Sequence, residues 1–427
     1  MMAHCLRRSA AVRRHTRRGS GYILILGAAM LVSVVGLSSL TLVRVQSRAG
    51  QTAIAAQRAR IHARSAVETV VAHSMADPSW RSNYATWASR MPLALDRGYC
   101  SAGISEPDGS ALLVDADTPV LIHGTGIAGT PARPEAIFRW TVRAYHPTLD
   151  LLRTALHSGS NVTASGAYLQ LAEGPISTNA TFTNTGTVIG DVEARQVSNW
   201  GWISGTVMSD ASNKPSPAAA WSYYRSRSTA ISVPAALAGR VLEWTAIGPD
   251  SNPWVPSKSS PDGLFHLKPS GDFRIRNCRI VGTLVVELAA GRKLILSDGL
   301  LWEPARADYP SLIVNGPCEI RLDSSLQEAG RANFNPPGMP YEDQSDNDFW
   351  DSYSGLLRGV FHVVGSSSTV VIENQTRIRG VLIADGPVTI KDQVQLTADP
   401  NLFLSPPLMY RASWLELEPG TWQAVTE

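Results

Sequence analysis

The segment Phe182-Thr-Asn184-Thr-Gly-Thr-Val188-Ile-Gly190-Asp-Val192 returns fifteen residues later as Val197-Ser-Asn199-Trp-Gly-Trp-Ile203-Ser-Gly205-Thr-Val207. Two further copies are Ile275-Arg-Asn277-Cys-Arg-Ile280-Val-Gly282-Thr-Leu284 and Ile372-Glu-Asn374-Gln-Thr-Arg-Ile378-Arg-Gly380-Val-Leu382. In all four, an apolar residue stands two positions before an Asn, and an apolar-x-Gly-x-apolar motif follows after a short gap. The Asn-to-Gly distance is six residues in three copies and five in one. Such self-similarity indicates a repeat architecture.

The four copies predict a parallel β-helix over residues 158–427. In a solenoid of this kind, short strands turn alternate side chains into a narrow core, and each coil covers the apolar face of the next. Gly and Asn accept the positive φ of tight corners, and stacked Asn side chains can form ladders of amide hydrogen bonds. An ordinary β-sandwich with chance similarity between the segments is the alternative.

We expect the corners of the solenoid at the four asparagines and the four glycines of the pattern, which are Asn184, Gly190, Asn199, Gly205, Asn277, Gly282, Asn374 and Gly380. The inward-facing side chains should include Val188, Val192, Ile203, Val207, Ile280, Leu284, Ile378 and Leu382. Two proline-rich stretches, 209–262 and 323–356, interrupt the pattern. Both are expected to be long loops that leave the solenoid, because insertions in such folds collect outside the stacked core.

The run from Gly21 to Val43 contains 23 residues and no charge. At about 1.5 Å per residue it can cross a hydrocarbon core of roughly 30 Å. Six arginines and no acid precede it, so the positive-inside bias places the leader, residues 1–21, in the cytoplasm. We expect a single-pass inner-membrane protein with its bulk periplasmic or exposed at the cell surface. A cleaved signal peptide and a buried core helix are the alternatives.

The helical pattern continues beyond the apolar run. Small and apolar residues recur at three- and four-residue steps as far as residue 76, and Pro78 is the stop signal. A transmembrane and extended helix over residues 22–76 follows from this. Residues 77–157 alternate short apolar runs with glycines, which predicts a small α/β or β domain, a collar of antiparallel strands. The expected fold class is therefore mainly β, with an N-terminal transmembrane helix, a small α/β collar and a C-terminal parallel β-helix.

The net charge of +2 hides an asymmetry. Eleven of the 38 basic residues precede the first acid, Glu68, so 27 basic residues face 36 acidic ones in the remainder. A mildly acidic exterior has no basic stripe for phosphates, so nucleic acid is not an expected partner. Membrane lipid is an expected partner, because the basic leader is attracted to the anionic lipids of the cytoplasmic leaflet. Beyond Cys5, three cysteines without CxxC spacing indicate no zinc site, and both a Cys278–Cys318 bridge and buried free thiols stay open.

The N-terminal stretch Arg17-Arg-Gly19-Ser20-Gly21-Tyr22-Ile-Leu-Ile-Leu-Gly and the helical extension through Glu68 resemble the start of PilX-like minor pilins and type II secretion K-type pseudopilins. The resemblance covers residues 1–76 and implies a leader that a prepilin peptidase cuts after Gly19 or Gly21. It also implies other pilin-like subunits as partners. The remainder is similar to bactofilin-like or adhesin-like solenoids.

The chain departs from the pilin pattern at one position. Most type IV pilins have a glutamate five residues after the cleavage glycine, where this sequence has Leu24 or Leu26. K-type and some PilX-like members also lack it. The departure favours a tip or accessory role over that of a major subunit.

Parallel β-helices also serve as polysaccharide lyases and glycosidases, which use paired carboxylates in a groove. The candidate carboxylates are Glu342, Asp343, Asp346, Asp348 and Asp351, with Trp302, Trp350 and Tyr341 as candidate sugar platforms. An EF-hand starting at Asp343 fails, because Asp348 and Ser354 replace its obligatory Gly and Glu. A looser calcium site through Asp343, Asp346 and Asp348 and a solvated acidic loop are the two interpretations of this patch.

No GxSxG, HExxH or P-loop motif occurs, and His123, His266 and His362 lie in strand-like contexts. We assign no catalytic residue and expect no cofactor. The sequence thus predicts a membrane-anchored, pilin-like envelope protein with a structural or adhesive role in a type IV pilus-like or secretion pseudopilus-like assembly. A membrane-tethered β-helix enzyme acting on surface polysaccharide is the alternative.

Overall fold

The computed structural model describes residues 18–112, 118–232, 240–250 and 259–425. The arginine-rich leader up to residue 17, with Cys5, lies outside the described residues. Two compact units divide the chain. The first contains the N-terminal part as far as Val114, the segment Val120–Ala144 and the C-terminal residues from Leu417, and the second contains essentially everything between Tyr145 and Glu416.

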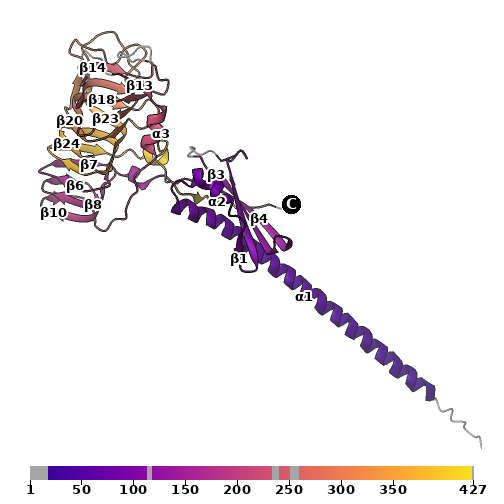
Figure 1. Ribbon diagram of the computed structural model, residues 1–427. Helices are drawn as coiled ribbons and strands as arrows, with labels where there is room; N and C mark the ends of the chain where they lie inside the picture. The colour runs from indigo at the N-terminus through magenta and orange to yellow at the C-terminus, as the bar shows by residue number, and fades with distance from the viewer. Residues whose placement is uncertain (1–17, 113–117, 233–239, 251–258, 426–427) are drawn as a thin grey trace, which may run out of the picture. The chain divides into compact units, whose positions relative to one another are not determined.

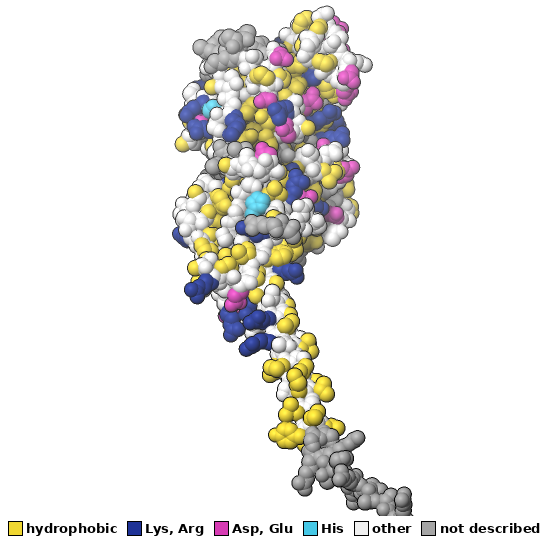
Figure 2. Space-filling model, turned by 90° about the vertical axis from the view of Figure 1, so that its right-hand side faces the viewer, with side chains coloured by type: hydrophobic (Ala, Val, Ile, Leu, Met, Phe, Trp, Pro, Cys, Tyr) yellow, Lys and Arg dark blue, Asp and Glu magenta, His cyan; other side chains and the backbone are white. Residues whose placement is uncertain are grey.

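The first unit begins with helix α1 (Arg18–Ala76), which is 59 residues long (Figure 1). Its first half is apolar, with a mean hydropathy of 2.4 over an 18-residue window, and none of that window is buried. Figure 2 shows hydrophobic side chains around this part of the helix. By length and composition, α1 is able to cross a membrane, as the sequence predicted.

The second half of α1 packs on an antiparallel sheet through small side chains. The sheet contains β1 (Leu93–Leu95), β2 (Gly98–Ser105), β3 (Val120–Thr130) and β4 (Arg133–Tyr145), and α2 (Trp80–Ala88) precedes it. Ala59, Ala63 and Ala66 are fully buried. On the facing strand a Cβ at Gly126 would lie 2.0 Å from the carbonyl oxygen of Ala59. Alanine on the helix and glycine on the strand therefore permit this close backbone approach.

The C-terminus also belongs to this sheet. Strand β29 (Gln423–Ala424) pairs antiparallel with β4. The sequence analysis had extended the β-helix to residue 427, because the last residues carry no signal that separates them from the solenoid.

The second unit is a parallel solenoid, which confirms the predicted fold class and excludes the antiparallel sandwich. Its first coils contain β5 (Leu156–Ser158), β6 (Val162–Ala164), β7 (Tyr168–Ala172), β8 (Ile176–Asn184), β9 (Thr187–Ile189), β10 (Val192–Asn199), β11 (Trp202–Ile203) and β12 (Val207–Met208). Later coils contain β13 (Thr229–Ile231), β14 (Val241–Ile247), β15 (Leu264–Leu267), β16 (Phe273–Val281), β17 (Thr283–Glu287), β18 (Leu294–Glu303), β19 (Leu312–Asn315), β20 (Cys318–Leu322), β23 (Leu356–Val364), β24 (Val370–Asn374), β25 (Arg377–Ala384), β26 (Val388–Ile390) and β27 (Gln393–Thr397).

The coils do not stack in sequence order. Strands β25, β26 and β27 of the last coil pair with β5, β6 and β7 of the first. One face therefore runs β13, β15, β17, β19, β23, β25, β5, β8, β10, β12. The chain enters in the middle of the solenoid, winds to one end, crosses to the other end and winds back to its starting coil. In Figure 1, β10 and β14 accordingly lie at opposite ends.

The crossover is the stretch 209–262, where the sequence analysis expected a loop leaving the solenoid. It carries helix α3 (Ala220–Arg227), which is followed by β13 and β14. Tyr224 of α3 is fully buried in a cluster with Leu264, Val285 and Ile313 on the outside of the solenoid. That expectation is corrected, because β13 and β14 are rungs of the stack and α3 covers one of its faces.

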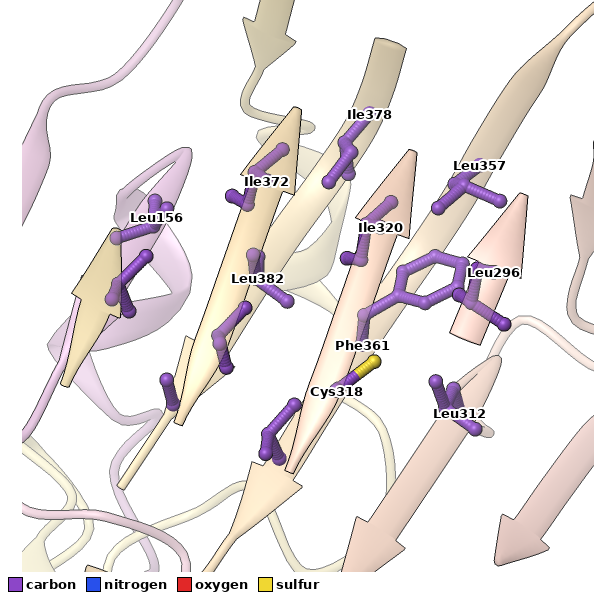
Figure 3. Close-up of a cluster of buried hydrophobic side chains, with 14 of the residues drawn as sticks. Leu156, Leu296, Leu312, Cys318, Ile320, Leu357, Phe361, Ile372, Ile378 and Leu382 are labelled. Atoms are coloured by element: carbon purple, nitrogen blue, oxygen red, sulfur yellow. The ribbon is translucent and has the colours of Figure 1, made fainter. Parts of the chain in front are cut away.

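The core is a continuous stack of hydrophobic side chains, most of them aliphatic (Figure 3). Of the predicted inward set, the fully or almost fully buried members are Val188, Val192, Ile280, Leu284, Ile378 and Leu382. Ile203 is partly buried against them. Val207 is 43% exposed because its strand, β12, is the last rung and pairs on one side only. Cys278 and Cys318 are buried in this core as free thiols, so no bridge joins them.

Candidate functional site

The apolar half of α1 is a surface without a partner in the described chain. Tyr22, Leu24 and Leu26 are 73%, 74% and 60% exposed. Gly21 lies in the same helical stretch, with open space around it. Gly19 and Ser20 fall within the first turn of α1. The prepilin-type candidates thus lie at the helix start, and contact with lipid or with other helices would remove this apolar area from water.

Two of the predicted corner asparagines form a ladder. Asn184 and Asn199 are opposite each other on β8 and β10, and the Asn184 Nδ2 donates to the Asn199 Oδ1 at 2.8 Å. Asn184 is fully buried, and its Oδ1 also accepts from the Gly186 backbone N–H at 3.0 Å. The side chain therefore holds the corner of its own coil and ties it to the next.

The other two asparagines occupy a different column. Asn277 and Asn374 have φ of 47° and 59°, which is the left-handed conformation. Asn374 pairs with Leu322, whereas the register through Ile372, Ile390 and Ala164 leads to Asn184. The four asparagines therefore do not share one equivalent position. The spacing from Asn to Gly is nearly the same in all four copies. It therefore could not distinguish the inward-facing amide of Asn184 from the left-handed corner of Asn374, which lies two positions further along the coil.

Three of the four predicted glycines lie where successive backbones approach closely, whereas a Cβ at the fourth, Gly190, would be 2.5 Å from the Leu171 side chain. A Cβ at Gly380 would be 2.0 Å from the Gly359 carbonyl oxygen, and one at Gly205 would be 2.3 Å from that of Gly190. A Cβ at Gly282 would likewise be 2.5 Å from the Gly263 carbonyl oxygen. These positions exclude a side chain by contact with the neighbouring coil.

The second interrupting stretch, 323–356, carries the acidic patch. A short antiparallel pair, β21 (Ser325–Gln327) and β22 (Ser352–Ser354), holds its two ends together. This pairing brings Glu328 beside Asp348 and Asp351, and one carboxylate oxygen from each lies within 4.8 Å of the others. Sequence reasoning missed Glu328, because the nearest of the candidate carboxylates, Glu342, is fourteen positions further along the chain.

The remaining residues of the patch are dispersed. Glu342 lies 3.9 Å from Arg358, and Asp343 is exposed with a φ of 64°. Trp302 is fully buried, and its indole N–H donates to the Gly282 carbonyl at 3.1 Å, so it is not a sugar platform. Tyr341 packs against Tyr353, and Trp350 is 79% exposed.

The three histidines singled out in the sequence have polar partners. His123 lies 3.1 Å from Ser105 Oγ, and His266 lies 3.4 Å from Glu287. His362 is buried between Tyr410 and Asp385, at 3.2 and 3.4 Å. Burial alone would raise the pKa of Asp385, but hydrogen bonds from His362, Ser216 and Gly365 lower it to about 2. The structure uses these groups as internal polar links.

No family model and no curated protein matches this chain. Among solved structures, the competence-associated pilin ComZ from Thermus thermophilus is 12% identical with a TM-score of 0.29, over 87% of this chain and 97% of that one. An ice-binding protein from the Antarctic ascomycete Antarctomyces psychrotrophicus is 12% identical with a TM-score of 0.20, over 59% and 98%. At these TM-scores, neither likeness assigns a function to this chain.

Proposed function

We propose that this chain is a membrane-anchored, pilin-like envelope protein that carries a β-solenoid outside the inner membrane. Its role is structural or adhesive, as an accessory subunit of a type IV pilus-like or secretion pseudopilus-like assembly. Its partners are membrane lipid and other pilin-like subunits, and its N-terminus is cytoplasmic.

The observation that supports this proposal is the division of α1 into two halves with opposite surroundings. Val32 and Val35 in the first half are 72% and 62% exposed, whereas Ala59 and Ala63 in the second half are fully buried against a sheet. Burial of a large aliphatic side chain is worth about 1.5–3 kcal/mol. A row of such side chains on one continuous helix favours insertion into a bilayer or a helical bundle, while the second half holds the collar.

The test is the mature N-terminus of the full-length protein, extracted from membranes of a bacterium that contains a prepilin peptidase. Mass spectrometry should find Ser20 or Tyr22 as the first residue, N-methylated. Gly19→Val and Gly21→Val are matched variants that identify the cleavage site. An intact Met1 or Met2 terminus would refute the pilin part of the proposal and leave the anchor, and a terminus beyond residue 45 would refute both.

Membrane insertion is tested separately by Val35→Arg, which places a charge in the middle of the apolar run. A central arginine costs about 2.5–3.5 kcal/mol of insertion free energy, so a larger fraction of the variant should be released by alkaline carbonate. Ile54→Arg is the control, because Ile54 is similarly exposed, at 51%, but lies beyond the run. Equal release of the two variants would contradict an anchor over residues 21–43.

A further inference from the structure

Several carboxylates of the 323–356 stretch lie close together, although a solvated loop would not require this. Oxygens of Glu328, Asp348 and Asp351 that lie within 4.8 Å of one another share a common point no more than about 2.8 Å from each, close to the 2.3–2.6 Å of a Ca²⁺–oxygen bond. Asp346 is next to them, because its carboxylate and that of Asp351 accept from the same amide group, the Nδ2 of Asn335, at 3.3 and 3.2 Å. Four carboxylates thus converge on one small volume.

Their negative charge is not balanced by protein cations. Within the described part of the chain, none of these four carboxylates forms an ion pair with a Lys, Arg or His. Glu328 is fully buried, and its oxygens accept only neutral donors, the N–H groups of Phe334 and Asp351 and the hydroxyl of Tyr353. A buried carboxylate without a positive partner is costly unless a cation is bound nearby.

A second observation comes from the amide of Asn335. This side chain is only 5% exposed, and its Nδ2 points at the carboxylates of Asp346 and Asp351. Its Oδ1 is buried without a hydrogen-bond partner among the described residues. Buried amide oxygens are nearly always paired, so this one requires an explanation. Rotation of the amide by a half turn would direct Oδ1 at the carboxylates, where a cation would accept it as a ligand.

We propose that Glu328, Asp346, Asp348, Asp351 and Asn335 form a binding site for one Ca²⁺ ion. The donors are all carboxylate or amide oxygens, which is the ligand type of hard cations, and sulfur and imidazole ligands are not part of the described cluster. Ca²⁺ accepts six to eight oxygens at about 2.3–2.6 Å in flexible geometry, and waters can complete the shell at the exposed side of Asp348. Asp343, a member of the trio that the sequence analysis considered beside a solvated acidic loop, is not part of the proposed site.

The ion would join both ends of the stretch. Glu328 directly follows β21, and Asp351 directly precedes β22. Bound Ca²⁺ would therefore fix the path of the intervening residues on the outside of the solenoid. The site is independent of the membrane anchor and of any assembly role.

The experiment uses the full-length protein in non-ionic detergent, freed of metal with a chelator. Ca²⁺ is titrated calorimetrically, and Tb³⁺ is titrated with excitation of tryptophan, because Trp350 is only two residues from the ligand Asp348 and its backbone N–H donates to the Asp348 Oδ1 at 3.0 Å. We expect one ion per chain, with a dissociation constant on the order of 10⁻⁴ M, as in extracellular calcium modules. Mg²⁺ should compete at least about tenfold less well, because it demands near-ideal octahedral geometry.

Variants decide whether the site is the one described. Asp348→Asn, at an exposed ligand, should weaken Ca²⁺ binding by about tenfold or more while circular dichroism stays unchanged. Asp343→Asn removes a charge from the same stretch and should leave the affinity within about twofold. Glu328→Gln should abolish binding, and its circular dichroism is checked because the residue is buried. Absence of saturable Ca²⁺ and Tb³⁺ binding up to about 10 mM, or equal loss in Asp343→Asn and Asp348→Asn, would overturn the proposal.

Discussion

Replacement of His157 by glutamine should make the stability of the solenoid less sensitive to mild acid. His157 lies on β5, the first strand of the unit, and is 1% exposed. Its Nδ1 is 2.7 Å from the Ser177 Oγ, and its Nε2 has no hydrogen-bond partner in the described chain. Burial, together with the positive charge of Lys214, lowers the pKa of His157 to about 4. The folded protein therefore holds this ring neutral.

The magnitude follows from proton linkage. In the unfolded chain a histidine has a pKa of about 6.5, so below that pH the unfolded state binds a proton that the folded state does not. Folding stability is therefore lost as the pH falls from about 6.5 towards 4. Between pH 7.5 and pH 5.0 the loss from this one ring amounts to about 2 kcal/mol, or roughly thirtyfold in the unfolding equilibrium.

The assay is urea unfolding of the full-length protein in detergent, followed by tryptophan fluorescence at pH 7.5 and 5.0. Wild type should lose about 2 kcal/mol more than His157→Gln between the two pH values. Ser177→Ala is the control, because it removes the hydrogen-bond partner of the ring but keeps the titrating group. Its stability should be lower by about 1 kcal/mol at both pH values, with the pH dependence retained. An identical pH dependence in wild type and His157→Gln would refute the assignment of a neutral buried ring.

Three further substitutions or treatments test the packing. Gly126→Ala should destabilise the collar by about 1–3 kcal/mol in thermal unfolding, because the new Cβ would meet the carbonyl oxygen of Ala59 on the helix. Gly103→Ala is the control, since the nearest heavy atom to its Cβ is 4.0 Å away, and it should change the unfolding free energy by less than about 0.5 kcal/mol. Cys278 and Cys318, whose pKa burial raises to about 12, should react with maleimide at pH 7.5 only after unfolding, and labelling of the folded protein would contradict their placement. Leu382→Ala should cost about 2–5 kcal/mol because Leu382 is fully buried where the last coil meets the first, and an unchanged melting temperature would be inconsistent with that junction.

Part of this architecture is local and could be predicted from the sequence. An uncharged run of 23 residues is apolar on every side of a helix. The apolar first half of α1 can therefore be predicted from composition. The fifteen-residue offset between Asn184 and Asn199 is one turn of the solenoid, and the structure places the two side chains in direct contact. In both cases the pattern fixes the environment of each residue within its own coil or helix.

The order of the coils was decided only by the tertiary structure. Every rung offers a similar unpaired edge, so a local pattern does not say that β25 pairs with β5 or that α3 crosses between the ends. The convergence of Glu328 with Asp351, and the pairing of β29 with β4, are likewise contacts between segments far apart in the chain. The sequence by itself determined which way most side chains of the repeat face, because that depends on their near neighbours, but it did not show that Trp302 is buried or that Val207 lies on the last rung. The pairing of distant segments requires long loops to close around a shared core. Its free energy therefore depends on contacts of the whole folded chain, and a local sequence pattern does not contain it.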